Sequence, residues 1–298
     1  MRKELPYRKA VFAGSWYAED PIALRKEIDS YLKSCRSSTD KQTAKIGMLP
    51  HAGLYYSGRG IAGFFNRISN EVNRVCIISP SHYSYLTADR ITTADFSYLE
   101  TPLLELPYEP LCEKFPDAMK ECNSKVLKEE HALEMVLPFI ARASEDFGHE
   151  ISVSMGLISH FSDAHYVNDL SDKMIEALGR DEILAGRTVI IASSDFTHYG
   201  ERFGYTPYGV DDISHMLNSV ASNDRSYAEG FVNGSIEELM VRCIEEKPTI
   251  CGFAPGLLAS AIACKLSLHG IVADYYSSND LTKNPLAEFV SYCTIIWE

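Results

Sequence analysis

The chain has 298 residues, of which 46% are hydrophobic, and it is therefore long enough and apolar enough to bury a large core. Acidic residues outnumber basic residues by 41 to 28, which gives a formal net charge of −13. Because an acidic surface repels phosphate groups, we expect neither a nucleic-acid partner nor docking to an anionic membrane surface.

The residues at the start of the chain, MRKELPYRKAVFAGSWY, carry positive charges but no apolar segment of the kind found in secretory signals. No apolar run approaches the roughly 20 residues that span a bilayer. We therefore expect a cytoplasmic protein whose eight cysteines stay reduced. No two of these cysteines form a CxxC pair, which argues against a zinc site of the finger type.

Helical and strand patterns alternate along the chain. Asp20 and Pro21 are typical of a helix start, and Pro138 is expected to kink the helix that contains it. Without a repeat or a linker, we expect one domain over 1–298, an α/β three-layer αβα sandwich with a mixed central sheet. In chain order, the patterns predict a helix over 20–35, a strand over 44–49, a helix over 57–68, a strand over 75–78, a helix over 129–146, a strand over 151–158, a helix over 163–178, a strand over 188–192, helices within 208–246, a helix over 254–268, and strands over 271–277 and 288–297.

Polar segments with histidine follow three of the predicted strands. His51 lies in LPHAG after the first strand, His82 lies in SPSHY after the second, and SSDFTH after the strand over 188–192 contains Asp195 and His198. A lone histidine is more often structural than functional. Because ligands of open α/β sheets bind beyond the carboxyl ends of the strands, however, we expect these segments to converge on one crevice.

Two histidines and a carboxylate form the facial triad of non-haem Fe(II) enzymes, and His51, His82 and Asp195 can supply it. Cys251 is the competing third ligand. It precedes a predicted helix, where the helix N-terminus would lower the pKa of its thiol. A thiolate ligand favours iron, copper or zinc over magnesium.

A further cluster, EEHALE over 129–134, places His131 and Glu134 on one face of the predicted helix. Two interpretations stay open for this cluster. It either lines the site or forms a solvated helix start, where the helix dipole favours acidic groups.

At these residues the sequence resembles the MEMO family, also called component B of the AmmeMemoRadiSam system. The resemblance runs through most of the chain and rests on seven segments in a fixed order: AGSWY at 13–17, PHAG at 50–53, PSH at 80–82, EHALEM at 130–135, SSDFTHYG at 193–200, RF at 202–203 and ICG at 250–252. It implies a fold like that of the class III extradiol dioxygenases (LigB-like), which hold Fe(II) with two histidines and a glutamate.

The resemblance implies metal ligation by His51, His82 and Cys251, with Cys251 in the place of the dioxygenase glutamate. Asp195 is then a fourth ligand or a hydrogen-bond partner, and His198 is the acid/base. The implied cofactor is iron or copper, with zinc as an alternative. The residues that we expect to line the pocket are His131, Glu134, Tyr83 and Trp16. Some relatives have histidine in place of Tyr83 or Val136, which changes what fits the pocket but removes none of these ligands.

Three functions remain open at this stage. The first is a non-haem iron or copper protein of the redox or oxygenase type, acting on a small molecule. The second is a non-catalytic module that binds a peptide or protein on a dioxygenase-like scaffold, and the third is a zinc hydrolase. Kinship further implies radical-SAM and AMMECR1-type proteins as partners.

Overall fold

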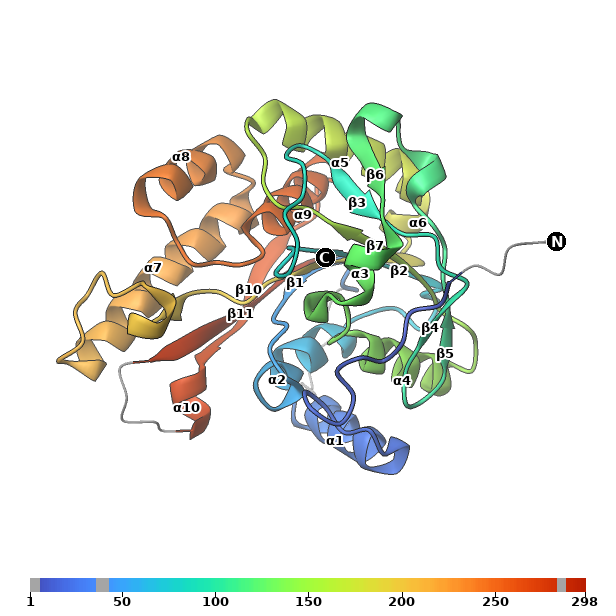
Figure 1. The fold of residues 1–298 in the computed structure, drawn as a ribbon, viewed down its shortest axis with the longest axis horizontal. Coiled ribbons are helices and arrows are strands. Elements are labelled where there is room, and N and C mark those ends of the chain that lie inside the picture. Colours follow the sequence, from blue (N-terminus) through green and yellow to red (C-terminus); the bar gives the residue numbers. More distant parts are fainter. Residues whose placement is uncertain (1–5, 36–42, 283–287) are drawn as a thin grey trace.

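A mixed β-sheet runs through the centre of the fold, and helices cover both of its faces (Figure 1). The computed structural model describes residues 6–35, 43–282 and 288–298. Within them the main sheet has nine strands, eight of them in the order β10-β11-β1-β8-β2-β7-β3-β6, and β9 pairs with β11. These strands are β1 (Ile46–Leu49), β2 (Arg74–Ser79), β3 (Ile91–Thr93), β6 (Lys120–Cys122), β7 (Ser152–Leu157), β8 (Thr188–Ser193), β9 (His198–Tyr199), β10 (Gly270–Ser277) and β11 (Phe289–Trp297).

The middle of the sheet is parallel. Strand β8 lies between β1 and β2 and pairs in parallel with both, and β2 pairs in parallel with β7. All residues of β1 and β8 are buried, as expected for parallel strands that are covered on both faces. Because the three strands β1, β8 and β2 run in the same direction, the segments that follow them lie at one edge of the sheet.

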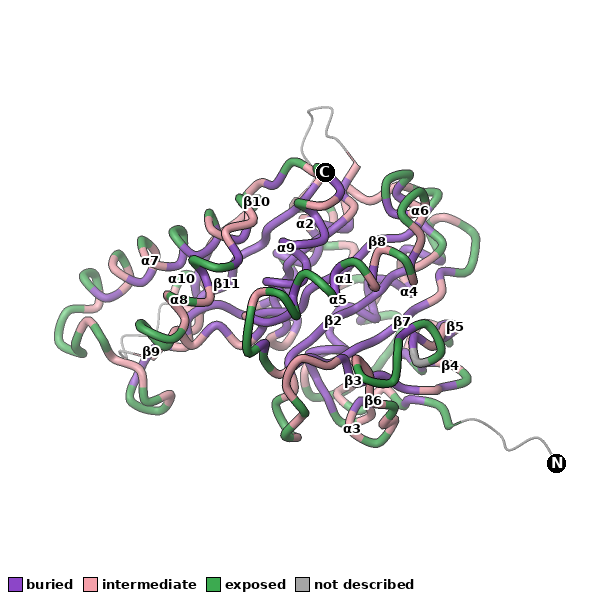
Figure 2. Tube along the Cα trace, turned by 90° about the horizontal axis from the view of Figure 1, so that it is seen from above, coloured by how far each residue is buried: buried purple, intermediate pink, exposed green. Residues whose placement is uncertain are grey.

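Two helical layers close the sandwich, and each has its own hydrophobic core. Along β2, Val75 and Ile77 face one core, whereas Cys76 and Ile78 face the other. Figure 2 shows the buried residues concentrated in the strands and on the inner sides of the helices. The first layer contains α1 (Pro21–Ser34), α2 (Leu54–Phe65) and α4 (Leu137–Phe147), and the second contains α5 (Ala164–Leu178), α6 (Arg180–Leu184), α7 (Ile213–Asn233), α8 (Ile236–Glu246) and α9 (Phe253–Lys265).

The structure confirms the predicted fold class but differs from the predicted elements around 129–146, where Glu130, His131 and Glu134 are buried and do not form a solvated helix start. Instead of one helix kinked at Pro138, the chain forms α3 (Ser124–Lys128), a 3-10 turn over His131–Leu133, and then α4. Pro138 occupies the first turn of α4, where no backbone N–H is required, so it starts a helix and does not bend one. The predicted kink is therefore wrong.

Short elements outside the predicted set complete the chain. Strands β3 and β6 extend the main sheet, and β4 (Tyr98–Glu100) pairs with β5 (Glu105–Pro107) in a separate two-stranded sheet. Helix α10 (Ser278–Thr282) follows β10. None of the helices in the described ranges combines the length and the hydropathy of a bilayer-spanning segment.

Candidate functional site

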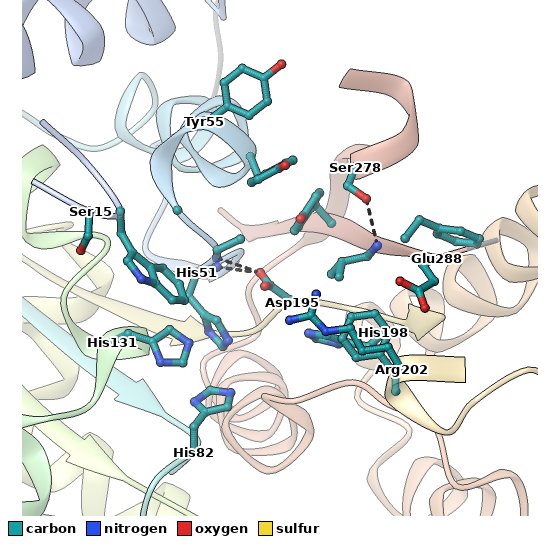
Figure 3. A pocket seen from close by; sticks show the side chains of 18 residues that line it. Ser15, His51, Tyr55, His82, His131, Asp195, His198, Arg202, Ser278 and Glu288 are labelled. Atoms are coloured by element: carbon teal, nitrogen blue, oxygen red, sulfur yellow. Dashed lines mark hydrogen bonds between the residues drawn. The ribbon is translucent and has the colours of Figure 1, made fainter. Parts of the chain in front are cut away.

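A cavity of about 670 Å³ lies at the edge of the sheet where β1, β8 and β2 end. The three polar segments that follow these strands all reach it, through His51, His82 and the pair Asp195 and His198. Figure 3 shows these side chains around one space, with His131 and His82 on one side and His198 and Arg202 on the other. The strand ends therefore converge as the sequence predicts.

His51 lies at the bottom of the cavity and is almost completely buried. Its backbone N–H donates to Asp195 Oδ1 at 2.7 Å, its Nδ1 lies 2.8 Å from Ser193 Oγ, and its Nε2 lies 3.0 Å from Cys251 Sγ. Burial, reinforced by the neighbouring imidazoles, lowers the pKa of His51 well below its ordinary value. The ring is therefore neutral at physiological pH.

His82 is held by a single buried carboxylate. Its backbone N–H donates to Glu130 Oε2 at 2.7 Å, and its Nδ1 lies 2.8 Å from Glu130 Oε1. Burial opposes the ionisation of Glu130, but the hydrogen bonds that it accepts from His82 and Ala132 help to outweigh burial, so the pKa of Glu130 lies below its ordinary value. Glu130 is therefore a carboxylate at neutral pH.

His51, His82 and Cys251 lie close enough together to hold one metal ion. Each offers one ligand atom, and the three atoms lie within 4.8 Å of one another. Two imidazoles and a thiol suit iron, copper or zinc, whereas magnesium and calcium prefer oxygen ligands. The donor set thus fits a transition-metal ion.

The thiol of Cys251 is protonated in the metal-free protein. Burial first, and the Asp195 carboxyl second, raise its pKa well above the ordinary value. The expectation of a pKa lowered by the helix N-terminus is wrong, because burial dominates at this position. A metal ion would have to displace this proton in order to bind the sulfur as thiolate.

Asp195 faces the cavity, but it lies outside that group of three ligand atoms. Its Oδ1 accepts the backbone N–H groups of His51 and Ala52, and its own backbone N–H donates to Cys251 Sγ at 3.2 Å. Asp195 therefore ties together the two segments that carry His51 and Cys251.

His198 completes the far side of the cavity. Its Nδ1 lies 3.1 Å from each of the backbone carbonyls of Phe196 and Thr249. Because carbonyls only accept hydrogen bonds, Nδ1 carries the hydrogen and Nε2 is left as the acceptor of the ring.

Of the four other residues expected to line the pocket, Trp16 and His131 do so. Their rings lie 4.6 Å apart, and burial lowers the pKa of His131 to about 4. Tyr83 lies behind His131 and contacts its Nδ1 through the hydroxyl at 2.9 Å, outside the cavity lining.

Glu134 does not line the cavity. It is fully buried and binds Arg8 Nη1 at 2.5 Å, the backbone N–H of Phe12 at 2.8 Å and the Tyr17 hydroxyl at 2.7 Å. Glu134 thereby anchors the N-terminal segment that carries Trp16 to the site.

The sequence interpretation assigned no role to Ser193 or Glu130, which hold His51 and His82. Ser193 lies in the same polar segment as Asp195, and Glu130 lies in the acidic cluster over 129–134. No spacing rule connects either residue to a histidine so far away in the chain, because these pairs form only in the folded protein.

Comparison with known proteins identifies the family of the chain. A family model described as Memo-like protein matches residues 8–296. Protein MEMO1 of Xenopus laevis is 32% identical over 272 residues, which cover 89% of this chain and 86% of that protein. A MEMO1 family protein of Schizosaccharomyces pombe is 30% identical over 223 residues, covering 73% of this chain and 69% of the relative. Protein MEMO1 of Homo sapiens is 26% identical over 303 residues, with 98% and 97% covered. The chain therefore belongs to the Memo family, whose fold is of the LigB-like class.

Proposed function

We propose that this protein binds one transition-metal ion through His51, His82 and Cys251 and is a metal-dependent redox protein, of the oxygenase type, for a small molecule held in the cavity. The observation that carries the proposal is the group of three ligand atoms within 4.8 Å of one another. His51 and His82 line a cavity that is large enough for a metabolite-sized ligand, and Cys251 lies beside His51, with its Sγ 3.0 Å from His51 Nε2.

The surrounding residues have distinct roles in this proposal. When bound, iron or copper supplies a redox-active, Lewis-acidic centre, and zinc supplies Lewis acidity alone. Asp195 fixes the backbone beside His51 and Cys251. His198, held through Nδ1 by two carbonyls, keeps Nε2 available to take a proton from a bound molecule.

The decisive measurement is the metal content of anaerobically purified protein, determined by mass spectrometry for the wild type, His51→Ala and Cys251→Ser. We expect about one iron or copper ion per wild-type chain and at least about a tenfold loss in both variants, because each removes a direct ligand. Matched controls are His149→Ala and Cys264→Ser, which remove a histidine and an exposed cysteine that do not belong to the group of three ligands. Metal-free wild-type protein that is folded would contradict the proposal.

A second candidate function is the binding of a peptide without catalysis. The observation in its favour is the aromatic wall of the cavity, formed by Trp16, Tyr55, Tyr56 and Phe203. Aromatic side chains supply a large contact area at low entropic cost. Stoichiometric iron or copper together with substrate-dependent oxygen uptake would exclude this candidate, whereas peptide binding that survives His51→Ala would favour it.

A further inference from the structure

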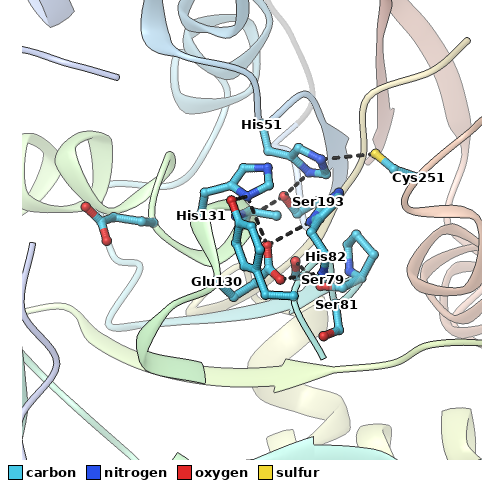
Figure 4. Close-up of polar contacts among 12 residues, drawn as sticks. His51, Ser79, Ser81, His82, Glu130, His131, Ser193 and Cys251 are labelled. Carbon is cyan, nitrogen blue, oxygen red and sulfur yellow. Dashed lines mark hydrogen bonds and ion pairs between the residues drawn. The ribbon is translucent and has the colours of Figure 1, made fainter. Parts of the chain in front are cut away.

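We infer that the turn Glu130–Ala132 orients both histidine ligands, with Glu130 and Ser193 as positioning residues that fix which ring nitrogen of His82 and His51 carries the hydrogen. The inference rests on the proposed metal site, because it assigns the remaining nitrogen of each ring to the ion. Figure 4 shows the contacts that carry it. In this inference, the acidic cluster over 129–134 orients the histidine ligands through Glu130.

The hydrogen of His82 lies on Nδ1. Glu130 is a carboxylate and can only accept hydrogen bonds. Its Oε1 lies 2.8 Å from His82 Nδ1, so Nδ1 is the donor, and in the neutral ring Nε2 keeps its lone pair. Because Glu130 Oε2 also accepts the backbone N–H of His82 at 2.7 Å, the carboxylate fixes both the ring and the backbone of this residue.

The hydrogen of His51 also lies on Nδ1. Ser193 has one hydroxyl hydrogen, and the carbonyl of Ala132, 2.7 Å from Ser193 Oγ, can only accept it. The serine oxygen is then the acceptor for His51 Nδ1 at 2.8 Å. The lone pair of His51 therefore lies on Nε2, the nitrogen that is 3.0 Å from Cys251 Sγ.

Both hydrogen-bond chains end on the same residue. The backbone N–H of Ala132 donates to Glu130 Oε1 at 3.1 Å, and its carbonyl accepts the hydroxyl of Ser193. A shift of this one turn would therefore move the partners of both ligands together. Each neutral ring is thereby left with Nε2 as the nitrogen that can bind the ion.

The same residues raise the alternative of a second ion, since ligand atoms of His82, Glu130 and His131 lie within 4.8 Å of one another. The carboxylate of Glu130, however, already accepts three N–H groups, from His82 twice and from Ala132. The arrangement therefore fits an orienting carboxylate and not a ligand.

The direct test is nitrogen-15 NMR of the imidazole rings in the metal-free protein, which reports the tautomer without depending on metal or activity. We expect the hydrogen on Nδ1 of both His51 and His82 in the wild type. Glu130→Gln should disturb the tautomer of His82, and Ser193→Ala should disturb that of His51. A wild-type ring with its hydrogen on Nε2 overturns the inference even where a variant fails to fold.

The functional consequence is measured by titrating each protein with cobalt(II) and following the absorbance of the sulfur–cobalt bond. We expect Glu130→Gln and Ser193→Ala to weaken binding by about 10- to 100-fold, the usual effect of losing a partner of a metal-bound histidine. Matched controls are Glu145→Gln, a carboxylate on α4 that pairs with Arg25 away from the cavity, and Ser154→Ala, a buried strand serine bonded to a backbone carbonyl. The controls should bind within about threefold of the wild type.

Each outcome separates this inference from the proposed function. Wild-type affinity in both Glu130→Gln and Ser193→Ala, or two cobalt ions per wild-type chain, overturns the inference. A wild-type protein that takes up no cobalt refutes the proposed metal site, and the NMR result still decides whether Glu130 and Ser193 fix the rings.

Discussion

At the scale of single residues, Thr294 is the one described residue with a buried side-chain polar atom, Oγ1, that has no hydrogen-bond partner. Replacing threonine by valine keeps the shape and removes the unpaired hydroxyl. We predict that Thr294→Val raises the free energy of unfolding by about 1 kcal/mol, because a buried polar group without a partner costs about that much or more. Urea unfolding measures the change.

The matched control is Thr197→Val, since the Thr197 hydroxyl donates to Asp224 at 2.6 Å. The same substitution should there lower the free energy of unfolding by about 1 kcal/mol or more. Equal effects at both positions would show that the hydroxyl of Thr294 finds a partner in solution.

The sequence predicts the residues that line the site better than it predicts the residues that hold them in place, Ser193 and Glu130. His51, His82, Asp195 and His198 follow strand ends, and the rule for open α/β sheets is enough to place them together. The resemblance implies that Cys251 is a ligand. Its place before a helix predicts a lowered thiol pKa, whereas burial raises the pKa in the folded protein. Local sequence carries no information on how deeply a thiol is buried.

At the scale of elements, the N-terminal segment is fixed by the buried ion pair of Arg8 and Glu134, both of which have fully buried side chains. Arg8 also donates to the backbone carbonyls of Leu127 and Glu130. We predict that Arg8→Ala lowers the free energy of unfolding by about 3–5 kcal/mol, because it leaves the Glu134 charge buried without its partner. Chemical denaturation gives the value.

Arg25→Ala is the control for this prediction. Arg25 pairs with Glu145, but 38% of its side chain is exposed, so the loss should stay below about 1 kcal/mol. Similar losses for the two variants would mean that solvent reaches Glu134 when Arg8 is removed.

Helix α7 is tied to the sheet by a buried carboxylate. Asp224 accepts hydrogen bonds from Thr197, Ser291 and Tyr275, and burial nevertheless raises its pKa. The folded protein therefore holds this proton more tightly than the unfolded chain, whose aspartates titrate near pH 3.9, about the usual value. Ionisation of Asp224 destabilises the fold as pH rises from about 4 through the pKa of the folded state.

We predict that the wild type loses unfolding free energy relative to Asp224→Asn as pH rises from about 4 to about 7, because the asparagine cannot ionise. Urea unfolding of both proteins across this range measures the difference. A difference that stays constant with pH would contradict the raised pKa.

The elements that the sequence missed are short. Strands β3, β4, β5 and β6 have three residues each and lack an apolar run long enough to distinguish them from loops. The error at Pro138 has another cause. A proline inside an apolar periodic stretch is compatible with a kink or with a new helix start, and the tertiary contacts of the preceding 3-10 turn decide between them.

At the scale of the whole molecule, the proposed ion would connect segments that lie 200 positions apart in the chain, at His51 and Cys251. Such a ligand binds the folded chain only. We predict that metal at about 100 times its dissociation constant raises the free energy of unfolding by about 2.7 kcal/mol. Calorimetry of wild type and His51→Ala measures this, and an equal rise in both would place the metal elsewhere.

The buried strands, their alternation with helices and the layered architecture with a mixed sheet follow from apolar patterning, and the sequence predicts all three. The sequence does not predict the position of β11 between β1 and β10, because the pairing of a strand depends on contacts with the rest of the sheet. Association with radical-SAM and AMMECR1-type proteins stays a prediction from the resemblance.

Strand β11 occupies an interior place in the sheet, between β1 and β10, although it contains residues as late as Trp297. During synthesis on the ribosome, β1 therefore keeps an open edge until residue 297 has emerged. An open strand edge is a template for pairing with other chains. The edge of β1 stays unpaired until β11 has been synthesised. The yield of the protein in cells should therefore depend on chaperones that cover strand edges during translation.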